Sequence, residues 1–273
     1  RYLCNQFTEI DGVRVPLFAG VFGIFGHGNV TCLSEALEAV QDVLPTWRGQ
    51  NEQSMALAAI GFAKAKQRRQ IMIATSSIGP GALNMVTAAG TAHANRLPVL
   101  LIAGDTFNNR LPDPVLQQVE HFNNPTTTVN DAFKSVTRYW DRITHPAQIL
   151  QSLPAALATM LDPADCGPAF LGLPQDVQGW AYDYPAAFFA RRIARRGAGR
   201  YGREAGQNDQ SLHRPFHHRF QDGKRSRRGP TAARHHLDRC ARFRRRAGRG
   251  AGRRQAAAVQ RRGHGRRTRS EER

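Results

Sequence analysis

Short apolar runs alternate with longer stretches of helical spacing from about residue 18 to residue 176. The short runs have the length and the β-branched content of buried strands, and strands are predicted at 20–25, 46–48, 71–75, 98–103 and 169–173. The longer stretches place apolar residues three or four positions apart, and helices are predicted at 33–43, 52–66, 82–95 and 146–161.

This alternation of apolar strands and amphipathic helices is typical of βαβ units. The fold class predicted is therefore α/β, a parallel sheet with helices on both faces. In such sheets ligands bind beyond the carboxyl ends of the strands. The loops at 26–29 and 78–81 and the turn before Glu52 each follow a strand, so we expect them at one edge of the sheet.

The formal net charge of +18 is concentrated at one end of the chain. Residues 191–273 contain 27 Lys and Arg against 6 Asp and Glu, whereas residues 1–190 contain 12 and 15. The segment 191–273 shows neither a helical nor a strand period and has few aliphatic residues, which predicts disorder. Two parts are therefore predicted, a globular domain over 1–190 and an Arg-rich unstructured tail over 191–273.

The Arg-rich tail has two interpretations. One is an arm that binds nucleic acid through its phosphates. Against it, aromatic residues are sparse in the tail and no basic repeat is regular. The other is translation of a GC-rich gene out of frame, which favours Arg, Gly, Ala, Pro and His. We favour the second because the periodicity ends abruptly near residue 190, so nucleic acid is not an expected partner.

Cysteine use and hydropathy bear on location. Four cysteines are scattered without a C-x-x-C pair, which argues against a zinc site or a disulfide framework and fits a reducing cytoplasm. No apolar run approaches membrane-spanning length, so no membrane partner is expected. The chain opens "RYLC", without Met or a leader, and is expected to be a fragment whose true beginning is missing.

Candidate chemistry begins with Glu52 in the stretch "RGQNEQSMALAA". An acid at a helix start suits the helix dipole, so the residue has a structural explanation as well as a functional one. The turn Gly79-Pro80-Gly81 and the loop "GHGN" around His27 are each, alone, compatible with simple turns. The sequence contains no P-loop, no G-x-S-x-G and no cluster of metal ligands, so no metal-binding residue is predicted.

Taken together, the order of these motifs is specific. "FGHGN", "GQNEQSMALAAIGFAKA", "TSSIGPGALNMVTAAGTAHANRLPVLLIAGD" and "PDPVLQQVE" resemble the pyrimidine-binding domain of thiamine-diphosphate enzymes of the acetolactate synthase class. Within that class, His27 and the extra residue in Ser76–Gly79 favour the ring-opening trihydroxycyclohexane-1,2-dione hydrolases of inositol catabolism. The resemblance covers about residues 1–190.

The resemblance implies roles for individual residues. Glu52 matches the glutamate that hydrogen-bonds N1′ of the cofactor's aminopyrimidine and so promotes removal of the proton from the thiazolium carbon, a catalytic and a cofactor-binding role. Gly79, Pro80, Gly81 and Asn84 match the loop that lies near the aminopyrimidine, and are expected to bind the cofactor.

Two further catalytic residues are implied in the same way. His27 and Gln117 match positions that face the reacting centre, where they could donate hydrogen bonds to a developing alkoxide. For His27, the alternative of a plain turn residue remains open.

The resemblance also implies thiamine diphosphate and Mg²⁺ as cofactors and a small-molecule cyclic dione as substrate, opened by hydrolysis of a C–C bond. Enzymes of this class bind diphosphate and Mg²⁺ through a separate domain with a Gly-Asp-Gly motif followed by an Asn, which residues 1–273 lack. Their active site forms between two subunits, so the intact enzyme is expected to be a homo-oligomer and this chain to be inactive alone. Two alternatives stay open: an acetolactate-synthase-like carboligase of α-keto acids, and a non-catalytic protein whose basic tail binds nucleic acid.

Overall fold

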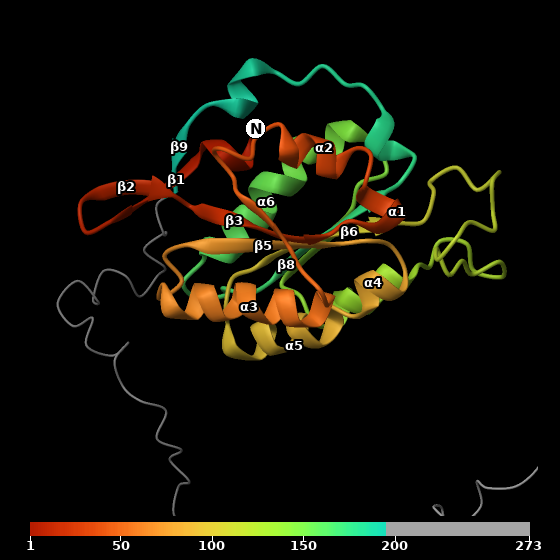
Figure 1. The fold of residues 1–273 in the computed structure, drawn as a ribbon, viewed down its shortest axis with the longest axis horizontal. Coiled ribbons are helices and arrows are strands. Elements are labelled where there is room, and N and C mark those ends of the chain that lie inside the picture. Colours follow the sequence, from red (N-terminus) through yellow and green to blue (C-terminus); the bar gives the residue numbers. More distant parts are fainter. Residues whose placement is uncertain (195–273) are drawn as a thin grey trace, which may run out of the picture. The chain divides into compact units, whose positions relative to one another are not determined.

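A six-stranded parallel sheet forms the centre of the protein in the computed structural model, which describes residues 1–194 (Figure 1). Every neighbouring pair of its strands is parallel, which confirms the predicted α/β class. In spatial order the strands are β4 (Thr46–Arg48), β3 (Phe18–Ile24), β5 (Ile71–Ser76), β6 (Leu100–Asp105), β8 (Ala169–Pro174) and β7 (Tyr139–Arg142).

The two central strands, β5 and β6, are buried along their whole length. Their sequences, "IMIATS" and "LLIAGD", are apolar at consecutive positions because both faces of a parallel sheet are covered. The sequence period of two that marks a half-exposed strand is therefore missing here, and run length is the useful signal.

Helices of two kinds cover the two faces of the sheet. On one face lie α3 (Glu52–Ala65), the single turn α4 (Pro80–Leu83) and α5 (Val86–Asn95), of which Figure 1 shows α3 and α5 side by side. Their buried residues are mostly alanines, which allow close approach to the sheet. The other face packs α2 (Leu33–Glu38) and α6 (Ile149–Leu161) through larger leucine and isoleucine side chains.

Helix boundaries differ from the predicted ones where backbone amides bond to carbonyls three residues back instead of four. The predicted loop 26–29 forms one helical turn, α1 (Gly26–Asn29). The helix predicted over 33–43 ends at Glu38, since Val40 and Gln41 donate to carbonyls three residues back rather than four. The helix predicted over 82–95 is divided into α4 and α5 for the same reason, because the Met85 amide bonds to Ala82.

Four strands were not predicted from the sequence. The hairpin of β1 (Gln6–Ile10) and β2 (Val13–Pro16) turns at Asp11-Gly12, both with positive φ, and β9 (Arg192–Ile193) pairs parallel with β1. Edge strand β7, with the sequence "YWDR", is only four residues long and has two aromatic residues followed by two charged ones, so it shows no strand period. Five 3₁₀ segments complete the fold, namely η1 (Leu3–Asn5), η2 (Val129–Ser135), η3 (Pro146–Gln148), η4 (Val177–Gly179) and η5 (Ala186–Phe189).

The predicted boundary at residue 190 stays a prediction, as the described chain runs on through β9 to residue 194. The tail predictions beyond it lie outside the described residues. Within residues 1–194 no helix combines the length and the apolar character needed to cross a membrane.

All six parallel strands end at the same edge of the sheet. The segments that follow them are 25–29 after β3, 49–51 after β4, 77–79 after β5, 106–128 after β6, 143–145 after β7 and 175–176 after β8. The expectation that the glycine-rich loops and the turn before Glu52 share one edge is therefore confirmed by the topology.

Candidate active site

Glu52 is the first residue of α3, at the carboxyl edge of the sheet. The residue before it, Asn51, is the N-cap: its backbone is extended and its side-chain Oδ1 accepts a hydrogen bond from the Ser54 amide at 2.9 Å. The Glu52 carboxylate thus lies in the first helical turn, where the helix dipole favours a negative charge.

The carboxylate of Glu52 is held from one side. Its Oε2 accepts a hydrogen bond of 2.8 Å from Asn84 Nδ2. Its Oε1 faces Gly81, where a β-carbon would lie 3.3 Å from that oxygen. Among the described residues no hydrogen bond reaches Oε1. Three residues predicted to bind the cofactor, Glu52, Gly81 and Asn84, are therefore brought together, with one carboxylate oxygen left free.

The turn at Gly79 accommodates a second loop. Gly79 has φ +62° and ψ −118°, and a β-carbon there would lie 1.8 Å from the carbonyl oxygen of Gln117. Only glycine fits both that backbone and that contact. Pro80 follows at the first position of α4, where a missing N–H costs nothing. Gln117 meets Gly79 through its backbone, while its side chain is exposed.

His27 lies in the α1 turn, next to the same central loop. Gly26 has φ +52° and a β-carbon there would meet Ser77 Oγ at 2.5 Å, and the Gly28 amide donates to Ser77 Oγ at 3.4 Å. The Nε2 atom of His27 is buried and has no hydrogen-bond partner among the described residues. The structure brings His27 beside Ser77, but no described hydrogen bond joins its ring to Glu52.

Sequence reasoning missed two glutamines that hold the His27 turn. Gln175 Nε2 donates to the His27 carbonyl at 3.1 Å, and Gln178 Nε2 donates to the Gly28 carbonyl at 2.9 Å. Both glutamines follow β8 in the motif "LPQDVQ". Two polar amides three residues apart at the end of a buried strand are the signal that could have indicated them.

Sequence reasoning also missed a buried ion pair at the carboxyl edge of the sheet. Asp105, 1 % exposed at its side chain, ends β6 and accepts a hydrogen bond of 2.7 Å from Arg142 Nε on β7. Arg142 also donates to the Thr126 carbonyl at 3.1 Å and lies 3.4 Å from an oxygen of Asp131. The available signal was an acid placed directly after the apolar run of β6.

Among the described residues, neither a metal-ligand group nor a tyrosine of raised pKa marks the candidate site. Residues 1–194 contain no group of three or more His, Cys, Asp or Glu side chains placed to hold a metal ion. Burial raises the pKa of Tyr2, Tyr139 and Tyr184 above the ordinary value of tyrosine. None of these tyrosines is a predicted site residue.

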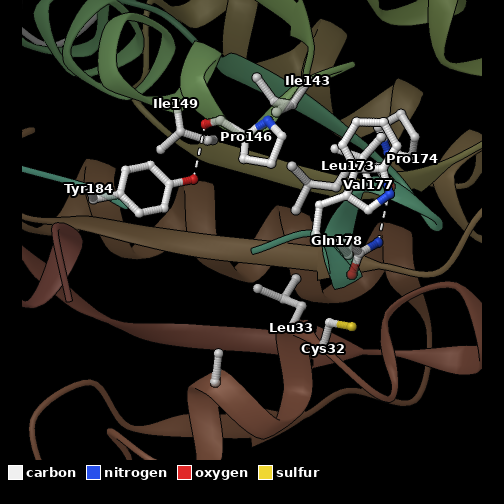
Figure 2. Close-up of a pocket in the computed structure, with 12 residues that line it drawn as sticks. Cys32, Leu33, Ile143, Pro146, Ile149, Leu173, Pro174, Val177, Gln178 and Tyr184 are labelled. Atoms are coloured by element: carbon white, nitrogen blue, oxygen red, sulfur yellow. Dashed lines mark hydrogen bonds between the residues drawn. The ribbon is translucent and has the colours of Figure 1, made fainter. Parts of the chain in front are cut away.

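An apolar cavity of about 230 Å³ lies between α2, η3, α6 and the end of β8, and Figure 2 shows the residues that line it. Its walls include Leu33, Ile149 and Leu173, and the Tyr184 hydroxyl donates to the Pro146 carbonyl at its side. No predicted site residue lines it. It touches the candidate site only through Gln178, which belongs both to its wall and to the support of the His27 turn.

Comparison with known proteins places this geometry in context. Residues 18–124 match the family described as thiamine pyrophosphate enzyme, N-terminal TPP binding domain. The chain is 52 % identical over 195 residues to a 3D-(3,5/4)-trihydroxycyclohexane-1,2-dione hydrolase of Geobacillus thermodenitrificans. Proteins of the same name from Clostridium tetani and, numbered 1, from Bacillus cereus are 51 % and 49 % identical over the same length.

These matches cover 71 % of this chain but only 30 % of each relative. The resemblance to thiamine-diphosphate enzymes that the motifs indicated is thereby confirmed for the N-terminal part of the chain. The matched family segment contains His27, Glu52, the Gly79–Gly81 turn, Asn84 and Gln117.

Proposed function

We propose that this chain, whose residues 18–124 match the N-terminal domain of thiamine pyrophosphate enzymes, supplies the aminopyrimidine side of a thiamine-diphosphate site. The observation that carries the proposal is the Glu52 carboxylate, held at Oε2 by Asn84 and free at Oε1 beside Gly81. An acid in this arrangement can hydrogen-bond a ring nitrogen and share a proton with it.

The residues around Glu52 fit an aromatic ring. Gly81 has no side chain, and a β-carbon there would sit against Glu52 Oε1 in the space a ring edge would need. Asn84 orients the carboxylate, so its free oxygen keeps one direction. Met55 and Ala56, one turn further along α3, are buried and make the wall behind the acid apolar. We assign Glu52 the N1′ contact, and Gly79, Pro80, Gly81 and Asn84 the shaping of the pocket.

His27 and Gln117 are proposed to act on the substrate. The buried, unpartnered Nε2 of His27 can hydrogen-bond an oxygen on which negative charge develops. The Gln117 backbone contacts Gly79 closely, which fixes the position of its α-carbon. Its exposed side chain therefore extends from a defined point at the mouth of the site.

The reaction proposed is the ring-opening hydrolysis of a trihydroxycyclohexane-1,2-dione, as in the names of the relatives. Bound thiamine diphosphate supplies the carbanion and the electron sink for breaking the C–C bond next to a ketone. Glu52 would hold and release the proton at the ring nitrogen, and His27 and Gln117 would stabilise charge on the substrate oxygen.

Diphosphate and Mg²⁺ would be held by residues other than those of the Glu52 site. We propose that these ligands come from the part of the relatives that this chain does not span, in a second subunit of a cytoplasmic homo-oligomer. This chain alone would then bind the cofactor weakly and show no turnover.

A chimera tests the proposal. The 195-residue stretch of this chain that aligns with the Geobacillus thermodenitrificans hydrolase, at 52 % identity, would replace its counterpart in that enzyme. With thiamine diphosphate and Mg²⁺ the chimera should open the cyclic dione ring. Glu52→Gln should lower kcat by about 10²–10⁴-fold, the size of a lost general acid–base contribution. The matched control is Glu35→Gln, because Glu35 is an exposed acid in the first turn of α2.

Product analysis separates the proposal from its alternative. An open-chain deoxy-uronate supports ring hydrolysis, whereas an acetohydroxy acid formed from α-keto acids would show a carboligase instead. Full activity of the Glu52→Gln chimera would refute the role of Glu52, whichever product forms.

A further inference from the structure

We propose that Gln175 and Gln178 are positioning residues that hold the His27 turn and tie it to the loop carrying Gln117. The proposal rests on the functions proposed above for His27 and Gln117. His27 and Gln117 lie about 90 positions apart in sequence, in segments that follow different strands. A direct contact between their side chains is not among the described ones, so their alignment needs a third element.

The α1 turn cannot hold itself. It contains four residues, Gly26–Asn29, and no side chain caps its N-terminus. Helices of that length are unstable without outside contacts, because too few hydrogen bonds offset the cost of ordering the backbone. The Gly28 amide donates to Ser77 Oγ and the Asn29 side chain donates to the Ser76 carbonyl, which ties the turn to the end of β5. The carbonyls of His27 and Gly28 are held separately, by the two glutamines.

Gln178 satisfies one of these carbonyls. Its Nε2 lies 2.9 Å from the Gly28 carbonyl, 3.0 Å from Asn29 Oδ1 and 3.0 Å from the Leu173 carbonyl. The last contact ties the amide to the end of β8, which is rigid because the strand is buried. Figure 2 shows Gln178 at the edge of the apolar cavity, and its side chain is partly buried there.

Gln175 holds the neighbouring carbonyl and extends the link. Its Nε2 donates to the His27 carbonyl at 3.1 Å, and its Oε1 accepts from Gln118 Nε2 at 3.4 Å. Gln118 is fully buried, and its Oε1 accepts from the Phe107 amide at 2.9 Å. Since Gln118 is the neighbour of Gln117, a chain of side-chain amides runs from the His27 turn to the Gln117 loop.

The test uses the full 273-residue chain without cofactor. Gln175→Met and Gln178→Met keep the length of the side chain but remove its hydrogen bonds. Gln151→Met is the matched control, because Gln151 is an exposed glutamine on α6. Two signals are measured: amide hydrogen exchange across the protein, and the NMR resonance of the His27 ring, assigned with His27→Asn.

Both variants should speed exchange of the amides in 26–30 about five-fold, the effect of losing one ordinary hydrogen bond. Gln175→Met should also speed exchange of the Phe107 amide, whereas Gln178→Met should not. Each should move the His27 resonance, and Gln151→Met should leave all of these signals unchanged.

Gln175→Glu keeps the proposal testable if a Met variant does not fold. It retains an acceptor for Gln118 but loses the donor to His27, so the His27 signals should change while the Phe107 amide stays protected. An unchanged His27 resonance in the variants, or faster exchange spread evenly over the whole sheet, would overturn the proposal. Because no cofactor is present, either result is independent of whether Glu52 has its proposed role.

Discussion

Glu52 and Asp105 are both acids at the carboxyl edge of the same sheet, yet their surroundings are opposite. Asp105 is 1 % exposed and is bound by the Arg142 guanidinium at 2.7 Å and by the Thr106 amide at 2.8 Å. Glu52 is half-buried, and its described side-chain partner is a neutral amide, that of Asn84.

The difference indicates which acid is available for chemistry. A carboxylate paired with a buried arginine contributes to the fold and has little capacity to bind anything else. A carboxylate held by one neutral donor keeps a free oxygen and no counter-charge. The first arrangement ties β6 to β7 and to the end of the 106–128 loop, whereas the second leaves Glu52 facing the edge where ligands bind in such folds.

The largest expected effect comes from breaking the Asp105–Arg142 pair. Arg142→Met should lower the free energy of unfolding by about 3–5 kcal/mol, because it leaves a buried carboxylate without its partner. Urea unfolding followed by circular dichroism measures it. Arg69→Met is the control: Arg69 pairs with Asp11, whose side chain is 84 % exposed, so the loss should stay below about 1 kcal/mol. Equal losses of unfolding free energy in Arg142→Met and Arg69→Met would contradict the distinction between a buried and an exposed ion pair.

Gly79→Ala should have the next largest effect. A methyl group there would collide with the Gln117 carbonyl and would hold alanine at φ +62°. Strain of this kind costs about 1–3 kcal/mol. The same unfolding experiment measures it, with Gly61→Ala as the control because nothing lies within 4 Å of a β-carbon at Gly61. A Gly79→Ala protein as stable as its Gly61→Ala counterpart would show that the two loops do not meet as described.

Glu52→Gln should change stability much less than Asp105→Asn. The glutamine oxygen can still accept from Asn84, so the expected loss is the helix-dipole term of about 0.3–1 kcal/mol. The Asp105 variant instead loses a buried charge opposite Arg142 and should be clearly less stable. Parallel urea curves test the pair. A loss at Glu52 as large as that at Asp105 would mean that Glu52 is a structural acid.

The smallest effect on stability is expected from ionisation of the Tyr184 hydroxyl at high pH. Burial raises its pKa above 10.0, and it donates to the Pro146 carbonyl at 2.9 Å in its neutral form. Since the folded pKa lies above the unfolded one, the stabilisation is complete below about pH 10 and is lost as the pH rises through the folded pKa. Absorbance titration of the phenolate and unfolding at pH 9 and 11 measure this, with Tyr184→Phe as control. A smaller loss in wild type than in Tyr184→Phe would contradict the assignment.

The sequence allowed the α/β class and the site segments to be predicted, because buried strands and alternating helices leave a composition signal that needs no tertiary contact. It predicted Glu52 at a helix start, and the structure has it at the first residue of α3. It did not predict the bond from Asn84 to Glu52, since two residues 32 positions apart meet only after β3 pairs with β4 on one side and with β5 on the other.

The misses have one physical cause. Strand β7 is only four residues long and its apolar side chains neither alternate nor form a run, and the glutamines of "LPQDVQ" are polar. No periodicity therefore distinguishes these segments from loops. Their partners, the Asp105 carboxylate and the His27 and Gly28 carbonyls, come from other strand ends. A pattern along the chain cannot show a hydrogen bond that depends on which strands are neighbours.

The sequence by itself determined the class of fold, the order of the main strands and helices between residues 18 and 173 apart from β7, and the identity of the candidate residues. Those properties depend on local burial and on short motifs, which are written along the chain. Tertiary structure decided which acid is free and which is paired, and that two glutamines support His27. These outcomes depend on distances of about 3 Å between segments far apart in sequence, which only the strand order and the packing of the loops at the carboxyl edge set.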